Sequence, residues 1–218
     1  MSDAVRRFYG RRARTYDLLA RYTPGVRRWR RAAVTALDLD PGDTVLDIGC
    51  GTGASFPYLR DAVGPAGRVV GVDVTPELLD RATRRASRWQ NVTVVAGDGS
   101  TPPVCGGVDG VLGCFVVGLF EAPATVVDEW ATLLGSAGRI ALLDGVPAGW
   151  STGLDRVFGY LVRVGTPPGS REAVLDRLRT RVDGAHGRVT ARGTATTEQA
   201  FALGYVRLSA ATLGEGGD

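Results

Sequence analysis

A predicted strand that runs directly into a glycine-rich turn limits the fold more than any other stretch. Residues 44–48 are apolar and β-branched, Gly49, Gly51 and Gly53 follow at alternate positions, and residues 54–62 have a helical pattern. Glycine permits a tight turn and lets a ligand approach the backbone where a Cβ would clash. In an open parallel sheet, this first turn lies at the carboxyl ends of the strands, where ligands bind. A glycine-rich turn without a ligand is the competing interpretation.

Short apolar runs continue to alternate with helical patterns after this turn. Strands are predicted over 68–72, 91–96, 108–117 and 139–143, and helices over 77–89 and 124–134. Such alternation predicts repeated βαβ units, and so an α/β fold with a doubly wound, mostly parallel sheet and helices on both faces. Helical patterns over 154–164 and 170–182 then lead to two strand-like runs, 188–194 and 201–212. The short link between these runs predicts an antiparallel pair, because a parallel pair needs a long crossover.

The length of 218 residues predicts a single domain. We expect residues 1–40 to form a basic helical lid, 41–145 the ligand-binding core, and 146–218 further helices and the antiparallel strands. All 26 cationic residues are Arg, ten of them within residues 1–31, which carry a net charge of +8 while the remainder carries −5. The absence of Lys excludes a lysine Schiff base and a P-loop lysine.

Three carboxylates are expected around the glycine-rich turn. Asp73 ends the second predicted strand, twenty residues after Gly53, where a carboxylate can accept both hydroxyls of a ribose. Asp98 ends the third strand and is placed to receive an exocyclic amine, and Asp47 suits a cationic amine or an ordered water. Such a set fits a positively charged ligand with amine, ribose and adenine groups, and it does not fit a pyrophosphate.

The stretch from Asp47 to Gly53 resembles the nucleotide loop of class I S-adenosylmethionine-dependent methyltransferases. Asp73, residues 96–98, 108–112 and 134–139 resemble that family's later motifs in the same order. The resemblance implies a seven-stranded, Rossmann-like sheet with an antiparallel last strand. It also implies S-adenosyl-L-methionine as cofactor and S-adenosyl-L-homocysteine as product. The cofactor-binding residues that it implies are Asp47, Gly49, Cys50, Gly51, Gly53, Asp73, Val74, Asp98, Gly99 and Phe115.

A nicotinamide dinucleotide is the alternative cofactor, which would make the protein an oxidoreductase. Its loop has the spacing G-x-G-x-x-G, whereas this chain has G-x-G-x-G with Ala54 in the next position. Because that motif tolerates Ala, the spacing alone leaves the alternative open. The position of Asp98 and the antiparallel ending favour S-adenosylmethionine.

The candidate catalytic residues are Tyr9, Tyr16 and Asp144. The two tyrosines lie in a segment that resembles the lid of methyltransferases of the ubiquinone/menaquinone-biosynthesis and phospholipid N-methyltransferase groups, and packing of an amphipathic helix is the competing interpretation. Asp144 ends the fifth predicted strand and would face the acceptor, with a turn or cap carboxylate as the alternative. The only histidine, His186, lies in a turn-like context, so we expect a solvated loop residue without a catalytic role.

The expected function is methyl transfer to a small or amphiphilic acceptor such as a lipid, a quinone or another small molecule. A cofactor-binding partner protein without activity is the alternative, and the acceptor atom, N, O or C, and the oligomeric state stay open. We expect a cytoplasmic protein whose arginine-rich segment has a solvated face or makes peripheral contact with a membrane, and which has no nucleic-acid partner. Three cysteines without CxxC spacing predict neither a disulfide framework nor a metal site.

Overall fold

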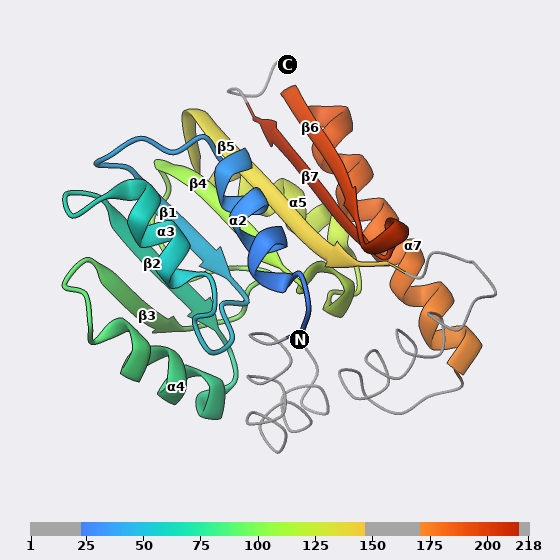
Figure 1. Ribbon diagram of the computed structural model, residues 1–218. Helices are drawn as coiled ribbons and strands as arrows, with labels where there is room; N and C mark the ends of the chain where they lie inside the picture. The colour runs from blue at the N-terminus through green and yellow to red at the C-terminus, as the bar shows by residue number, and fades with distance from the viewer. Residues whose placement is uncertain (1–22, 147–170, 214–218) are drawn as a thin grey trace.

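One mixed seven-stranded sheet runs through residues 23–146 and 171–213, which the computed structural model describes (Figure 1). The strands lie in the order β3-β2-β1-β4-β5-β7-β6. Every neighbouring pair is parallel except those of β7, which runs antiparallel to both β5 and β6. This confirms the α/β class and the antiparallel last strand. The bounds are β1 Thr44–Ile48, β2 Arg68–Asp73, β3 Val92–Ala96, β4 Val108–Cys114, β5 Leu134–Gly145, β6 Thr194–Phe201 and β7 Val206–Thr212.

Helices cover both faces of the sheet. One apolar cluster packs α2, α3 and α4 against one face, and a second packs α5 and α7 against the other. In Figure 1, α2 and α3 lie in front of the sheet and α5 and α7 behind it. The helices are α2 Val26–Ala36, α3 Phe56–Val63, α4 Pro76–Ala86, α5 Pro123–Thr132 and α7 Arg171–Arg192, with the 3₁₀ turns η1 Val117–Leu119 and η2 Ala202–Gly204.

The strand order reverses direction around β1, and this positions the site. From β1 the chain crosses to β2 and β3 on one side, whereas β4 and β5 lie on the other. The loops after β1 and β4 therefore leave the sheet in opposite directions. A crevice forms between them at the carboxyl ends of these two strands, which is where open α/β sheets bind ligands. Val45, Leu46 and Ile48 are buried within this central strand.

The last third of the chain departs from the prediction in one respect. The predicted strand over 188–194 is wrong, because α7 continues to Arg192 and β6 begins only at Thr194. Val182, Ala185 and Val189 recur at helical spacing and are buried against the sheet, and this burial outweighs the β-branched residues of the segment.

Other predicted segments fall outside the described residues, namely residues 1–22 of the predicted lid and the helical pattern over 154–164. Within the described ranges, no helix is both long and apolar enough to cross a membrane.

Candidate cofactor-binding site

A pocket opens at the carboxyl ends of β1 to β4. Seven of the ten predicted cofactor residues line it, namely Gly49, Gly51, Asp73, Val74, Asp98, Gly99 and Phe115. The remaining wall residues are mostly apolar and were not predicted from the sequence, namely Thr75, Leu78, Val116, Leu119 and Phe120. Asp47, Cys50 and Gly53 are not part of the wall. The pocket therefore combines a polar floor of loop and carboxylates with an apolar side.

The glycine-rich turn requires glycine at its first and last positions. Gly49 and Gly53 have φ angles of +68° and +71°, in the region that side chains disfavour. A Cβ at Gly49 would clash with Val116, and one at Gly53 would clash with the ring of Phe56. The turn is tied to β2, because the backbone N–H groups of Gly49 and Cys50 both donate to the Val72 carbonyl, at 2.8 and 3.0 Å.

Asp73 connects the turn to the start of α4. Its Oδ2 accepts a hydrogen bond from the Gly51 N–H at 2.9 Å, and its Oδ1 accepts one from the Thr75 N–H at 2.8 Å. Burial raises the pKa of this carboxyl, and the backbone donors of Thr75 and Gly51 work in the opposite direction. A carboxylate oxygen has more than one lone pair, so Asp73 can hold the turn and still accept hydrogen bonds from a ligand in the pocket.

Asp47 and Arg30 lie behind the turn and carry opposite charges. Burial raises the pKa of Asp47 from its ordinary value of 3.8 to about 7, while the Arg30 guanidinium lowers it and Asp73 raises it further. Arg30 comes from α2, donates to the Ser55 hydroxyl at 2.8 Å, and stacks over the ring of Phe115 at 5.4 Å.

Both side chains have an unused polar atom. Asp47 Oδ2 and Arg30 Nε are buried without a hydrogen-bond partner among the described residues. Such atoms cost free energy unless a partner satisfies them. Asp47 Oδ2 is an acceptor that suits an ammonium group, and Arg30 Nε is a cationic donor that suits a carboxylate. Together they fit the α-amino and α-carboxylate groups of an amino-acid ligand.

The loop after β3 is held by polar contacts. Asp98 Oδ1 accepts hydrogen bonds from the backbone and the hydroxyl of Ser100, at 2.9 and 2.8 Å. The indole of Trp130, fully buried on α5, donates to the Gly99 carbonyl at 2.7 Å and meets the pocket residue Phe120 edge to face. These contacts fix the place where an adenine ring is expected.

The end of β4 has a strained backbone conformation. Phe115, which lines the pocket, has a positive φ of 58°, which is uncommon for a residue other than glycine. Its N–H donates to the Leu143 carbonyl of β5 at 2.7 Å. The strand predicted over 108–117 therefore ends at Cys114, and the turn directs Phe115 and Val116 into the pocket.

The cysteines next to the site are neutral thiols. Burial raises the pKa of Cys50 well above its ordinary value and raises the pKa of Cys114 to about 12. Cys105 is exposed, and all three cysteines are free. The described residues contain no group of three or more His, Cys, Asp or Glu side chains that could hold a metal ion.

The candidate catalytic residues are placed differently from the cofactor set. Tyr9 and Tyr16 lie outside the described residues. Asp144 is buried at the end of β5, does not line the pocket, and lies 3.3 Å from the imidazole of His186. The prediction that His186 is a solvated loop residue is wrong: it is on α7, 1% exposed, because Ala185 and Val189 bury that face of the helix.

Arg30 is a charged residue next to the site that was not predicted from the sequence. It is one of ten arginines within the first 31 residues, so its type does not single it out. Its spacing does, because Val26, Ala33 and Leu37 form the buried face of α2, and Arg30 falls on that face. A charged residue on the apolar side of a helix indicates a buried partner or a ligand.

Comparisons with known proteins agree with this geometry. A protein-family model described as a methyltransferase domain matches residues 45–138. Demethylmenaquinone methyltransferase of Tropheryma whipplei is 30% identical over 143 residues, which are 64% of this chain and 58% of the relative. Nocamycin O-methyltransferase of Saccharothrix syringae is 38% identical over 129 residues, 56% of this chain and 46% of the relative. The chain thus spans about half the length of these two relatives.

A solved structure has the same fold. The N-methyltransferase NodS of Bradyrhizobium japonicum, in complex with S-adenosyl-L-homocysteine, superposes with a TM-score of 0.59 at 21% identity, over 88% of this chain and 89% of that one. Residues 45–138 thus match a methyltransferase domain, and the ordered motifs, the glycine-rich turn and the antiparallel last strand support a class I S-adenosylmethionine-dependent methyltransferase.

Proposed function

We propose that this protein transfers the methyl group of S-adenosylmethionine to a small or amphiphilic acceptor. The observation that carries the proposal is the pair of oppositely charged orphan atoms, Asp47 Oδ2 and Arg30 Nε, behind the glycine-rich turn. A methionyl group has the ammonium and the carboxylate that would satisfy both. A nicotinamide dinucleotide would instead bring a pyrophosphate next to three carboxylates, Asp47, Asp73 and Asp98, which repel it.

The order of the strands supports a different part of the cofactor for each residue. Asp98 after β3 would hold the adenine amine, and Asp73 after β2 the ribose hydroxyls. Asp47 on β1 and Arg30 on α2 would hold the methionyl ammonium and carboxylate. In the order of the strands, β4 and β5 follow β1. The acceptor would therefore enter at the carboxyl ends of β4 and β5, next to Phe115.

The chain's own contribution to the reaction is positioning and exclusion of water. The bound cofactor supplies an electrophilic methyl group on a sulfonium. The apolar wall of Val116, Leu119 and Phe120 keeps water from this group. Holding the two reactants at near-attack distance removes most of the entropic cost of bringing them together.

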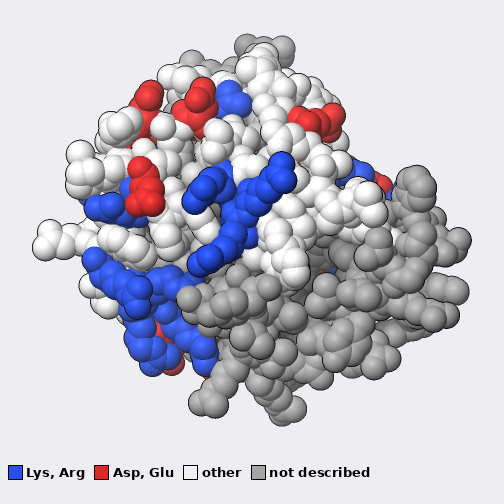
Figure 2. Space-filling model, in the orientation of Figure 1, with Lys and Arg blue, Asp and Glu red and all other residues white. Residues whose placement is uncertain are grey.

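The named relatives support a small-molecule or amphiphilic acceptor. One is a demethylmenaquinone methyltransferase and another a nocamycin O-methyltransferase, and both names refer to small molecules. The cytoplasmic location and the peripheral membrane contact are further parts of the proposal. Exposed arginines, including Arg27, Arg28 and Arg31 of α2, gather over α2 and α4 and favour an anionic surface (Figure 2).

Calorimetric titration with S-adenosylmethionine, S-adenosylhomocysteine and NAD tests the cofactor. Asp73→Asn is expected to weaken S-adenosylmethionine binding at least tenfold, because a charged acceptor for the ribose hydroxyls is lost. Asp109→Asn is the matched control, since Asp109 accepts the Thr44 N–H at the opposite end of the sheet and is exposed. NAD binding without S-adenosylmethionine binding would overturn the proposal.

Methyl transfer is tested with radiolabelled S-adenosylmethionine and a panel of probe acceptors. Catechol supplies a hydroxyl, aniline a neutral amine, and a short-chain menaquinone precursor an activated carbon. Product from any of them supports the activity. Tight cofactor binding with no product across the panel favours the alternative of a non-catalytic partner protein.

A further inference from the structure

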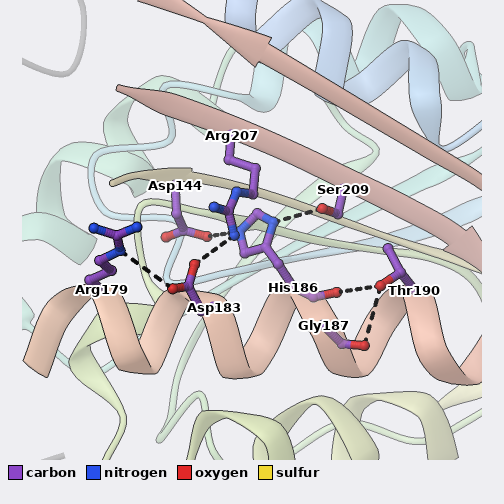
Figure 3. A network of polar contacts seen from close by, with 8 residues as sticks. All are labelled: Asp144, Arg179, Asp183, His186, Gly187, Thr190, Arg207 and Ser209. Carbon is purple, nitrogen blue, oxygen red and sulfur yellow. Dashed lines mark hydrogen bonds and ion pairs between the residues drawn. The ribbon is translucent and has the colours of Figure 1, made fainter. Parts of the chain in front are cut away.

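A buried chain of three polar side chains lies next to the cofactor pocket and has no part in holding the cofactor. Asp144 of β5, His186 of α7 and Ser209 of β7 are 2%, 1% and 0% exposed. His186 Nδ1 lies 2.8 Å from the Ser209 hydroxyl, and its Nε2 lies 3.3 Å from Asp144 Oδ2 (Figure 3). Burying three polar groups between a helix and a sheet is costly compared with apolar residues, so the chain calls for an explanation beyond packing.

The hydrogen bonds determine where the protons are. An ionised carboxylate can only accept, so Nε2 of His186 must carry a hydrogen and donate it to Asp144 Oδ2. In the neutral imidazole, Nδ1 then accepts, and the Ser209 hydroxyl donates to it. The Asp144 carboxylate therefore selects the tautomer, and the Ser209 hydroxyl, which can donate or accept, fits it by donating to Nδ1. The second carboxylate oxygen, Oδ1, has no hydrogen bond to any residue in the described part of the chain.

The position of Asp144 is close to where the acceptor would enter. Phe115, which lines the pocket, is bonded through its N–H to the carbonyl of Leu143, the residue before Asp144. On the other side, Arg181 of α7 donates to the Gly118 carbonyl of η1 at 3.3 Å, and Leu119 of η1 lines the pocket. Asp144, His186 and Ser209 thus lie between strand β5 and helix α7, which both contact residues of the pocket wall.

We propose that Asp144 accepts the proton of a hydroxyl-bearing acceptor, and that His186 and Ser209 are positioning residues that hold its carboxylate for this task. The inference rests on the proposed methyl transfer and names its substrate class, a phenol or enol. The acceptor's O–H bond breaks and its proton moves to Asp144 Oδ1. An oxygen electron pair forms the new O–C bond, and the S–C bond breaks with its electrons left on sulfur. A neutral amine acceptor needs no such base to attack.

Few other titratable groups among the described residues face Asp144, His186 and Ser209. From β4, Cys114 is a neutral thiol, since burial raises its pKa to about 12. Beside His186 on α7, Asp183 pairs with Arg207 of β7 at 2.7 Å and with Arg179 at 3.7 Å, and these side chains are partly exposed (Figure 3). The Asp183–Arg207 pair spans the same helix–strand contact as the buried chain, so it provides a matched control.

The first test needs neither cofactor nor acceptor. His186 is the only histidine of the protein, so nitrogen NMR of labelled protein reports on a single imidazole without assignment. The neutral ring is expected as the Nε2–H tautomer in the wild type and as a mixture of tautomers in Asp144→Asn, whose amide can donate or accept. A wild-type ring in the Nδ1–H form would overturn the proposal, because Nε2 could not then donate to Asp144.

The second test compares a hydroxyl probe with an amine probe. With catechol, Asp144→Asn is expected to lower kcat at least about 100-fold, the usual effect of losing a general base. Ser209→Ala should lower it about tenfold and Ser209→Thr should restore it. With aniline these variants should stay within about threefold of wild type, and Asp183→Asn should leave both rates unchanged. Calorimetry should show unaltered cofactor affinity throughout.

Three outcomes would contradict the proposal. Asp144→Asn could retain the catechol rate, it could lose both rates equally while folded and cofactor-bound, or Asp183→Asn could reproduce its effect. If Asp144→Asn does not fold, Ser209→Ala and the wild-type tautomer decide the question. Failure of the proposed function is a separate result, in which the wild type transfers methyl to no probe.

Discussion

Replacing Asp47 by Asn should change stability in a strongly pH-dependent way. Because burial raises the pKa of this carboxyl from 3.8 to about 7, the folded protein holds the proton more tightly than the unfolded chain does. The contribution of Asp47 to stability is therefore fully present below about pH 4, is lost as the pH rises towards 7, and stays lost above it. Asn mimics the protonated side chain and avoids this loss.

The size of the effect follows from the same pKa. Between pH 5 and pH 8 the free energy of unfolding of the wild type falls by up to about 1.4 kcal/mol per pH unit through Asp47, or by about 3 kcal/mol in all. The free energy of unfolding of Asp47→Asn relative to wild type should rise by roughly that amount between pH 5 and pH 8. Asp47 is 1% exposed, so solvent screening reduces the figure little.

Urea unfolding of wild type and Asp47→Asn at both pH values measures this difference directly. Asp109→Asn serves as the control, because Asp109 is an exposed residue of β4. A difference for Asp47→Asn that is the same at both pH values within about 0.5 kcal/mol would refute the reasoning. The charged Asp47 would then be stabilised by a partner outside the contacts described above.

Three further substitutions probe the site and its support. Gly53→Ala should destabilise the fold by about 1–3 kcal/mol and weaken cofactor binding. The reason is that Gly53 has a φ of +71° and that a Cβ there would clash with Phe56. An unchanged melting temperature would contradict this prediction. Gly184→Ala, on α7 with open space around it, should stabilise by about 1 kcal/mol in urea unfolding, so any loss would be unexpected. Trp130→Phe removes the hydrogen bond to Gly99 and should cost about 1 kcal/mol together with weaker adenine binding, measured by calorimetry with adenosine.

The sheet was predictable from the sequence because local signals and packing agree in it. Central strands such as β1 are short apolar runs bounded by glycine or proline turns, and their helices have clear periodicity. The boundary between α7 and β6 was not predictable in the same way. Val189 and Thr190 are β-branched residues on a helix, and only contact with the sheet determines the state of this segment.

The cofactor wall shows a similar division. The carboxylates and glycines were predictable, since their chemistry and spacing along the chain are local. Leu119 and Phe120 were not, because apolar residues after a strand look like any other loop. His186 was misjudged because Gly184 and Gly187 flank it and suggest a turn, whereas the structure tolerates both glycines within a long helix.

The position of β7 inside the sheet has a consequence for how the protein is made. β7 follows β6 in the chain, yet it lies between β5 and β6 and is the strand with which β6 pairs in the sheet. While a ribosome is still synthesising residues 206–212, β5 presents an open edge and β6 has no strand to pair with. The nascent chain therefore exposes an unpaired apolar edge until this last segment emerges, and that edge is a natural point for a chaperone to act.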